Sequence, residues 1–179
     1  MVNKSVIYSK DAVEFITVGK EFMAFCESKT EGGRKGFSET SLKLISLLYL
    51  KALSMPETEA QESESFEKYI TEEAWAFVKF TVENKLEEWD DIVDIRDATT
   101  LNNTDFINVS ISELYADIYQ DIGDLLGSYQ MGDESAMYDA LFVCRDNFLN
   151  YWGVRAIKIL ETLHYRLYTE IEKDDNGVS

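Results

Sequence analysis

Residues 110–132, SISELYADIYQDIGDLLGSYQMG, decide the fold class of this chain. Their apolar side chains recur every three or four residues, which is the spacing of an amphipathic α-helix. Ser110 and Glu113 form the serine-x-x-glutamate pattern that caps the start of a helix, and Gly132 is placed to end it. The segment therefore predicts one long helix with defined ends.

The same segment carries four acidic residues that a helix would align in one stripe: Glu113, Asp117, Asp121 and Asp124. On a helical wheel of about 100° per residue, this stripe lies roughly 110° from the centre of the apolar face. In helical bundles that bind a di-metal centre, by contrast, the carboxylates project inward among the apolar residues. We therefore predict that the stripe faces solvent.

Similar patterns predict helices before this segment. Ser9 can cap a first helix, which ends at the helix-breaking stretch TEGGRKG, residues 30–36. We expect Ser38 to open a second helix, limited by Pro56, and Thr71 to cap a third. The second helix contains LKLISLLYLKAL, which is apolar around most of its circumference and therefore predicts the central element of the fold.

The remaining segments are less regular. Residues 90–109 predict a long irregular connection with one short strand-like piece. Asp133 can cap the next helical segment, and residues 134–173 predict one or two helices with two apolar stripes rotated by roughly 90° from each other. Because Gly153 lies where the phase changes, we expect a kink or break there, or a helix that changes its packing partners midway. Trp152 begins the second stripe and is expected to be buried against the first or second helix.

These elements predict a single all-α domain over residues 1–179, folded as a compact irregular bundle of five to seven helices. Its core spans about residues 9–172. A flexible acidic loop is expected at about residues 57–67 and a frayed tail at residues 173–179.

The composition restricts the possible partners. Thirty-four acidic residues against seventeen Lys and Arg give a net charge of −17, which repels phosphate backbones and anionic membranes. We expect no direct binding of nucleic acid, no membrane association, and a basic protein as partner. No apolar run approaches the ~18 residues of a membrane span. We expect Cys26 and Cys144 to be buried, reduced thiols. We therefore expect a cytoplasmic protein.

The residues that could support catalysis or metal binding form no complete set. Glu161 and His164 match the Glu-x-x-His unit of di-iron bundles, but such a site needs two units and the chain has one histidine. A Ser or Cys nucleophile would depend on the same histidine as its base. We expect no cofactor. The alternative is a metal-binding or hydrolytic enzyme that uses Asp117, Asp121, Glu161 and His164 together.

Residues 150–158 contain a second candidate site. Here Trp152 and Tyr151 stand beside Arg155 and Lys158, and these side chains could form a cation–π contact or a small anion-binding patch of Trp152, Arg155 and Lys158. Ion pairing of these cations with the acidic surplus is the favoured interpretation.

Four segments in this order resemble an uncharacterised bacterial family of domains of unknown function: LLYLKALSMPE, TEEAW, LYADIYQDI and NFLNYWGVRAIKILETLH. The resemblance covers about residues 10–168 and is most specific at Asp117, Tyr119, Asp121, Trp152, Gly153 and His164. It implies a compact helical domain and supplies no activity, substrate or cofactor. These residues are therefore either packing and capping residues or an unknown site. Gln120 stands where the family pattern often has a basic residue, which weakens the interpretation as a shared charge network.

We therefore expect a non-enzymatic interaction or regulatory module, such as an immunity or accessory protein, whose acidic surface meets a basic partner. A third hypothesis, suggested by the charge alone, is an acidic mimic of DNA.

Overall fold

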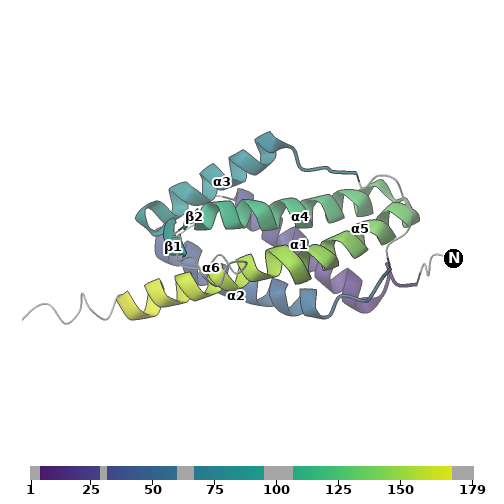
Figure 1. Ribbon diagram of the computed structural model, residues 1–179, viewed down its shortest axis with the longest axis horizontal. Helices are drawn as coiled ribbons and strands as arrows, with labels where there is room; N and C mark the ends of the chain where they lie inside the picture. The colour runs from purple at the N-terminus through teal and green to yellow at the C-terminus, as the bar shows by residue number, and fades with distance from the viewer. Residues whose placement is uncertain (1–4, 29–31, 60–66, 95–106, 171–179) are drawn as a thin grey trace, which may run out of the picture.

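The computed structural model describes residues 5–28, 32–59, 67–94 and 107–170 (Figure 1). The α-helices in these residues are α1 (Lys10–Glu27), α2 (Gly33–Leu53), α3 (Glu72–Leu86), α4 (Ile111–Met131), α5 (Glu134–Asn147) and α6 (Gly153–Tyr165). The shorter elements are η1 (Glu87–Trp89), β1 (Asp91–Asp94), β2 (Ile107–Ser110), and the π-helical turns η2 (Phe148–Trp152) and η3 (Arg166–Glu170). The prediction of an all-α fold is confirmed. None of the described helices is both long and apolar enough to cross a bilayer.

Helix α4 is the central element of the bundle. It packs against α1, α3, α5 and α6, and Figure 1 shows α3 along one edge of α4 with α5 beside it. Its side chains Tyr115, Ile118 and Ile122 are fully buried. The prediction that the bundle is built around LKLISLLYLKAL is therefore wrong: α2, which contains this stretch, does contact α1, α3 and α6, but Leu50 and Leu53 are exposed.

Side-chain caps define the starts of four helices, as the sequence predicts. A side-chain oxygen of the cap accepts a hydrogen bond from the backbone N–H three residues on, at Ser9, Thr71, Ser110 and Asp133. Helix α2 differs, because it begins at Gly33 and not at Ser38, which lies buried inside the helix. Gly32 precedes it with φ 89°, a left-handed conformation that suits glycine.

A pair of short strands leads into α4. β1 and β2 pair antiparallel, with Asp91 opposite Ser110 and Asp94 opposite Ile107. The structure therefore has two strand pieces in the 90–109 region, where the sequence predicted one. Residues 95–106 between them lie outside the described part of the chain, as do residues 60–66 of the predicted acidic loop and the predicted frayed tail.

The last two α-helices form one rod that passes through the π-helical turn η2, and Figure 1 shows the ribbon continuing from α5 into α6. A π turn holds one more residue than an α turn, which corresponds to about 100° of rotation. This matches the phase change between the two apolar stripes and confirms a helix irregularity next to Gly153. The Gly153 N–H donates to the Phe148 carbonyl, which closes the π turn.

Trp152 lies in the core, as predicted. Its ring is fully buried and stacks on Phe15 of α1 at a centroid distance of 6.3 Å. Its indole Nε1 donates to the Cys144 carbonyl oxygen at 3.1 Å. Cys144 and Cys26 are both buried and free, as expected, and burial raises the pKa of each thiol.

Candidate functional site

Three of the four carboxylates of the α4 stripe are covered by other elements, while the Glu113 side chain keeps 41% exposure. Each of the four accepts a hydrogen bond from outside α4, and Asp124 is buried. The solvent-facing prediction is therefore wrong for Asp117, Asp121 and Asp124 and holds only in part for Glu113. The prediction fails because α4 has neighbours on several sides, and α3 and the α5–α6 rod cover the side of the helix that carries the carboxylates. We call the contacts of these four residues the α4 carboxylate seam.

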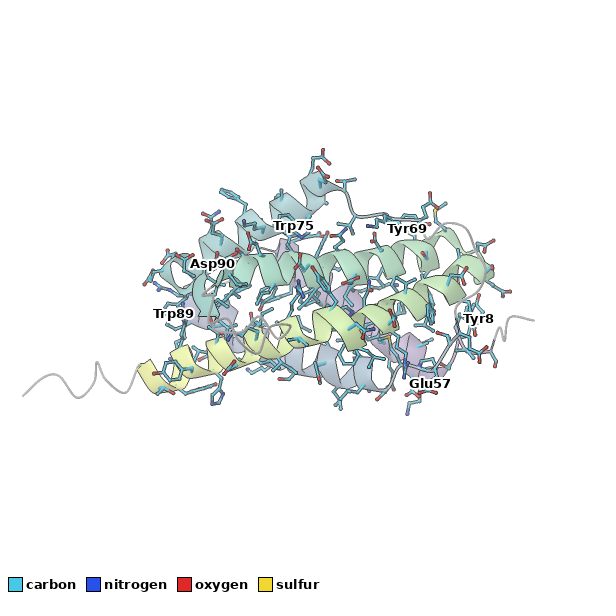
Figure 2. All side chains as sticks on the ribbon, in the orientation of Figure 1. Tyr8, Glu57, Tyr69, Trp75, Trp89 and Asp90 are labelled. Carbon is cyan, nitrogen blue, oxygen red and sulfur yellow. The ribbon has the colours of Figure 1, made fainter. Side chains whose placement is uncertain are left out.

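Asp117 joins three elements in this seam. Its Oδ1 accepts from the Trp75 indole Nε1 of α3 at 3.1 Å, and Figure 2 shows Trp75 in the space between α3 and α4. Its Oδ2 accepts from Arg155 Nε at 2.8 Å and from the Tyr151 hydroxyl at 3.2 Å. The Arg155 guanidinium also lies 3.3 Å from the centroid of the Tyr151 ring, so the predicted ion pair and cation–π contact are both present.

Glu113 lies one helical turn earlier and pairs with α3 in the same way. Lys79 Nζ donates to its Oε1 at 2.6 Å, and this contact holds the pKa of Glu113 below its ordinary value. The two acceptors Glu113 and Asp117 are four residues apart, and so are the two donors Trp75 and Lys79. Such matched spacing on two antiparallel helices is a signal from which this contact could have been found in the sequence.

Asp121 lies deeper in the seam. Its Oδ1 accepts from Asn147 Nδ2 at 2.5 Å, across to the end of α5. The pKa of Asp121 is raised to about 6, mainly by burial and also by the charges of Asp124 and Asp117, while the Asn147 hydrogen bond and Arg155 act in the opposite direction. The site therefore contains a carboxyl group that can change its protonation state near neutral pH.

Asp124 holds the segment that leads into α3. Its Oδ1 accepts from the backbone N–H groups of Tyr69 and Ile70 at 2.7 and 2.9 Å. Figure 2 shows Tyr69 above the C-terminal half of α4. Burial raises the pKa of Asp124, and the two N–H donors oppose that shift. The carboxylate is thus used as a structural clamp.

Asp90 is a buried carboxylate that the sequence pattern did not reveal. It accepts from the backbone N–H of Ser112 with Oδ1 and from the Ser112 hydroxyl with Oδ2, both at 2.7 Å, and so fixes the start of α4. Burial raises its pKa. In the sequence it stands in the irregular 90–109 region, and nothing in that pattern separates it from the neighbouring Asp91.

The structure does not assemble the alternative metal site. Glu161 pairs with Lys158 at 3.5 Å on the exposed side of α6, and the exposed His164 packs on the Tyr168 ring. Asp117 and Asp121 are engaged in the seam. Among the described residues, no three or more His, Cys, Asp or Glu side chains are grouped so that they could hold a metal ion.

The proposed anion patch is also dispersed. Trp152 is in the core, Arg155 is paired with Asp117, and Lys158 is paired with Glu161. These contacts are the ion pairing that the sequence favoured. The three residues therefore do not share one open surface.

The positions that carried the family resemblance have structural contacts. The Tyr119 hydroxyl donates to Glu27 of α1 at 2.6 Å, and Gly153 closes the π turn. Asp117, Asp121 and Trp152 each hydrogen-bond to another segment, as described above. Of the six positions, His164 lies on the exposed side of α6.

The seam leaves a contrasting surface on the opposite side of α3. We call it the α3 outer face; its exposed residues are Glu73, Ala76, Phe77, Phe80 and Glu83. Phe77 and Phe80 are 55% and 64% exposed. Sequence reasoning missed this face, because the spacing of Trp75, Val78 and Val82 only shows which side of α3 is buried.

Comparison with known proteins places the chain in a family. The family model described as a domain of unknown function (DUF5063) matches residues 6–169. The fold is similar to the crystal structure of protein BF1032 from Bacteroides fragilis, with a TM-score of 0.81 and 37% identity, over 92% of this chain and 96% of that one. No curated protein matches at a significant level. Since the family model spans the helical bundle from before α1 to the end of the rod, the chain belongs to the DUF5063 family of domains of unknown function.

Proposed function

We propose that this protein is a non-enzymatic interaction module that binds a basic segment of a partner protein on the α3 outer face. The observation that carries the proposal is a pair of exposed phenylalanines in a wholly acidic setting. Two buried free thiols suit a reducing compartment, which supports a cytoplasmic location for this function.

The apolar part of the face supports docking of a partner side chain. Phe77 and Phe80 are three residues apart, so their rings lie on the same side of α3. More than half of each side chain is exposed. Aromatic residues that gain burial on binding are the usual anchors of protein interfaces.

The charges on the same face support a basic partner. Glu73 and Glu83 flank the two rings and are exposed. The two lysines of α3 point away from this face: Lys79 pairs with Glu113, and Lys85 donates to the Phe25 and Cys26 carbonyl oxygens. The outer face therefore keeps a net negative charge, which the Lys79 ammonium offsets only in part through its charge interaction with Glu83.

A cationic amphipathic segment has the complementary chemistry. Its apolar side chains would cover Phe77 and Phe80, and its Lys or Arg side chains would pair with the flanking glutamates. Such binding is strengthened by the net charge of −17 and weakened by salt.

The test is a pull-down with the immobilised protein from extracts of its source cells, at about 50 and about 300 mM salt. The test variant is Phe77→Ser with Phe80→Ser, and the matched control is Val154→Ser with Ile157→Ser, which removes two apolar side chains of α6 that are also about half or more exposed. We expect basic proteins to be retained at low salt by the native protein and the control but not by the test variant. Retention that ignores salt, or that survives loss of both phenylalanines, would contradict the proposal.

A further inference from the structure

A second surface lies away from the α3 outer face. A cleft of about 750 Å³ runs between α1, residues 69–70 and α4. Its lining is mainly apolar and includes Ile16, Lys20, Met23, Ile70, Leu126 and Met131. Its volume falls within the range of about 300–1,000 Å³ that is typical of sites for small molecules.

Two glycines of α4 allow this cleft to form. Ile70 lies so close to Gly123 that a Cβ there would be 2.4 Å from Ile70 Cδ1, and a Cβ on Gly127 would be 2.3 Å from Tyr69 Cγ. Asp124, between the two glycines, accepts from both backbone N–H groups of residues 69 and 70. The wall of the cleft is therefore fixed to α4 by hydrogen bonds and close packing, so the cleft is preformed.

One cation lies in the lining. Lys20 stands on α1 between Ile16 and Met23, at spacings of four and three residues, so all three share one side of the helix. Within the described residues, no ion pair or hydrogen bond involves its ammonium group. Other cations of this acidic chain, such as Lys51 and Lys79, are paired with glutamates.

The polar groups of the two tyrosines in the lining are already used. The Tyr129 hydroxyl donates to the Ile7 carbonyl oxygen at 2.9 Å, and the Tyr69 hydroxyl donates to Glu67 at 3.1 Å. Gln130 adds one uncharged amide to the lining. Among the described residues, the lining therefore offers a mainly apolar wall with a single unpaired positive charge. Met23 and Met131 add flexible, polarisable surface that adapts to aliphatic chains.

We infer that this cleft binds a small amphipathic carboxylate, with its aliphatic chain along the apolar wall and its carboxylate paired with Lys20. A monoanion fits because the cleft supplies one ammonium group and the net charge of −17 opposes more negative ligands. This site is independent of the proposed α3 interaction.

The probe is decanoate, titrated below its micelle concentration by calorimetry, with decanol as the neutral analogue and decylammonium as the cationic one. We expect decanoate to bind about ten-fold more tightly than decanol, and decylammonium to bind more weakly than either. Lys20→Gln should remove the preference for decanoate and leave decanol binding unchanged. Lys43→Gln is the matched control, since Lys43 is also exposed and has no ion pair within the described ranges, but lies on α2, outside this cleft.

The position of the ligand can be read from the methionine methyl signals in an NMR titration. Met23 and Met131 line the cleft, whereas Met55 and Met137 are buried elsewhere in the core. We expect decanoate to shift the first two signals and leave the last two unchanged. Absence of decanoate binding, equal binding of decylammonium, a preference unaffected by Lys20→Gln, or shifts confined to Met55 and Met137 would each overturn the inference.

Discussion

The α4 carboxylate seam and the α3 outer face are two acidic regions on adjacent helices that the protein uses in opposite ways. In the seam, each carboxylate is held by donors from another segment, as Asp117 is by Trp75 and Arg155. On the α3 outer face, Glu73 and Glu83 surround exposed phenylalanines. The spacing of acidic residues along a helix is therefore a poor guide to their role; the donors on the elements that face them decide it.

The comparison implies that substitutions in the α4 carboxylate seam, or in the core beneath it, should lower the stability of the fold. Substitutions on the α3 outer face should not. The largest effect is expected beneath the seam, at the start of the α6 stripe. Trp152→Ala should lower the free energy of unfolding by about 3–5 kcal/mol, because it empties a fully buried site and removes the stacking on Phe15. Denaturant unfolding measures this. An unchanged midpoint would contradict the core position of Trp152.

Substitution of Asp117 should have the next largest effect. Asp117→Ala removes the acceptor of Trp75, Tyr151 and Arg155 and should cost about 2–3 kcal/mol, less than a fully buried pair because the two charged side chains keep 21% and 26% exposure. Glu83→Ala is the control on the outer face, since Glu83 is exposed and lies outside the first turn of α3, with an expected change within about 0.5 kcal/mol. Equal losses for the two variants would remove the distinction between the two regions.

Gly153→Ala should destabilise the rod that closes the seam. An added Cβ would lie 2.4 Å from the Phe148 carbonyl oxygen, so the π turn must shift. We expect a net loss of about 1–2 kcal/mol, since the gain of about 1 kcal/mol in helix propensity offsets part of the strain. Thermal unfolding tests this. A higher melting temperature for the variant would instead indicate a regular, open helix at this point.

The protonation of Asp121 should make the seam sensitive to pH. Its pKa rises from 3.8 to about 6 on folding. Between these values the native protein holds a proton that the unfolded chain has released, so stability falls as pH rises through this window. Asp121→Asn does not titrate and should be about 1–2 kcal/mol more stable than the native protein above about pH 6. The two proteins should converge below about pH 4. A difference that is constant from pH 4 to 7.5 would refute this.

The smallest effect on stability is expected on the α3 outer face. Phe77→Ser with Phe80→Ser should change the free energy of unfolding by no more than about 1 kcal/mol, because both side chains are more than half exposed. The same variant is expected to lose partner binding. A stability loss as large as that of Asp117→Ala would mean that these rings pack within the fold.

The parts of the fold that could be predicted depend on local interactions. A cap such as Ser9 or Thr71 acts on a backbone group three residues away, so its pattern is visible in the sequence. The start of α2 was missed because Gly32 and Gly33 begin it through positive φ, without a side-chain cap. The strand pairing of β1 and β2 joins segments that are distant in sequence, and only short alternating stretches indicated it.

The candidate sites were harder to predict, because they depend on contacts between helices. Asp117 lies 42 residues from Trp75 and 38 from Arg155, so a helical wheel for α4 alone shows the face that Asp117 occupies but not what covers it. The cleft is another example. Gly123 and Gly127 were visible in the sequence, but their role depends on Tyr69 and Ile70, which precede α3.

The π-helical turn at Phe148–Trp152 has a consequence for the evolution of the family. A π turn is what a single-residue insertion leaves in an α-helix, because the extra residue is absorbed without changing the helix ends. Deleting one residue there would give a regular helix and turn α6 by about 100° relative to α5. That rotation would carry Ile159 and Leu163 out of the core. Relatives one residue shorter at this point are therefore expected to carry compensating changes in the apolar stripe of their last helix.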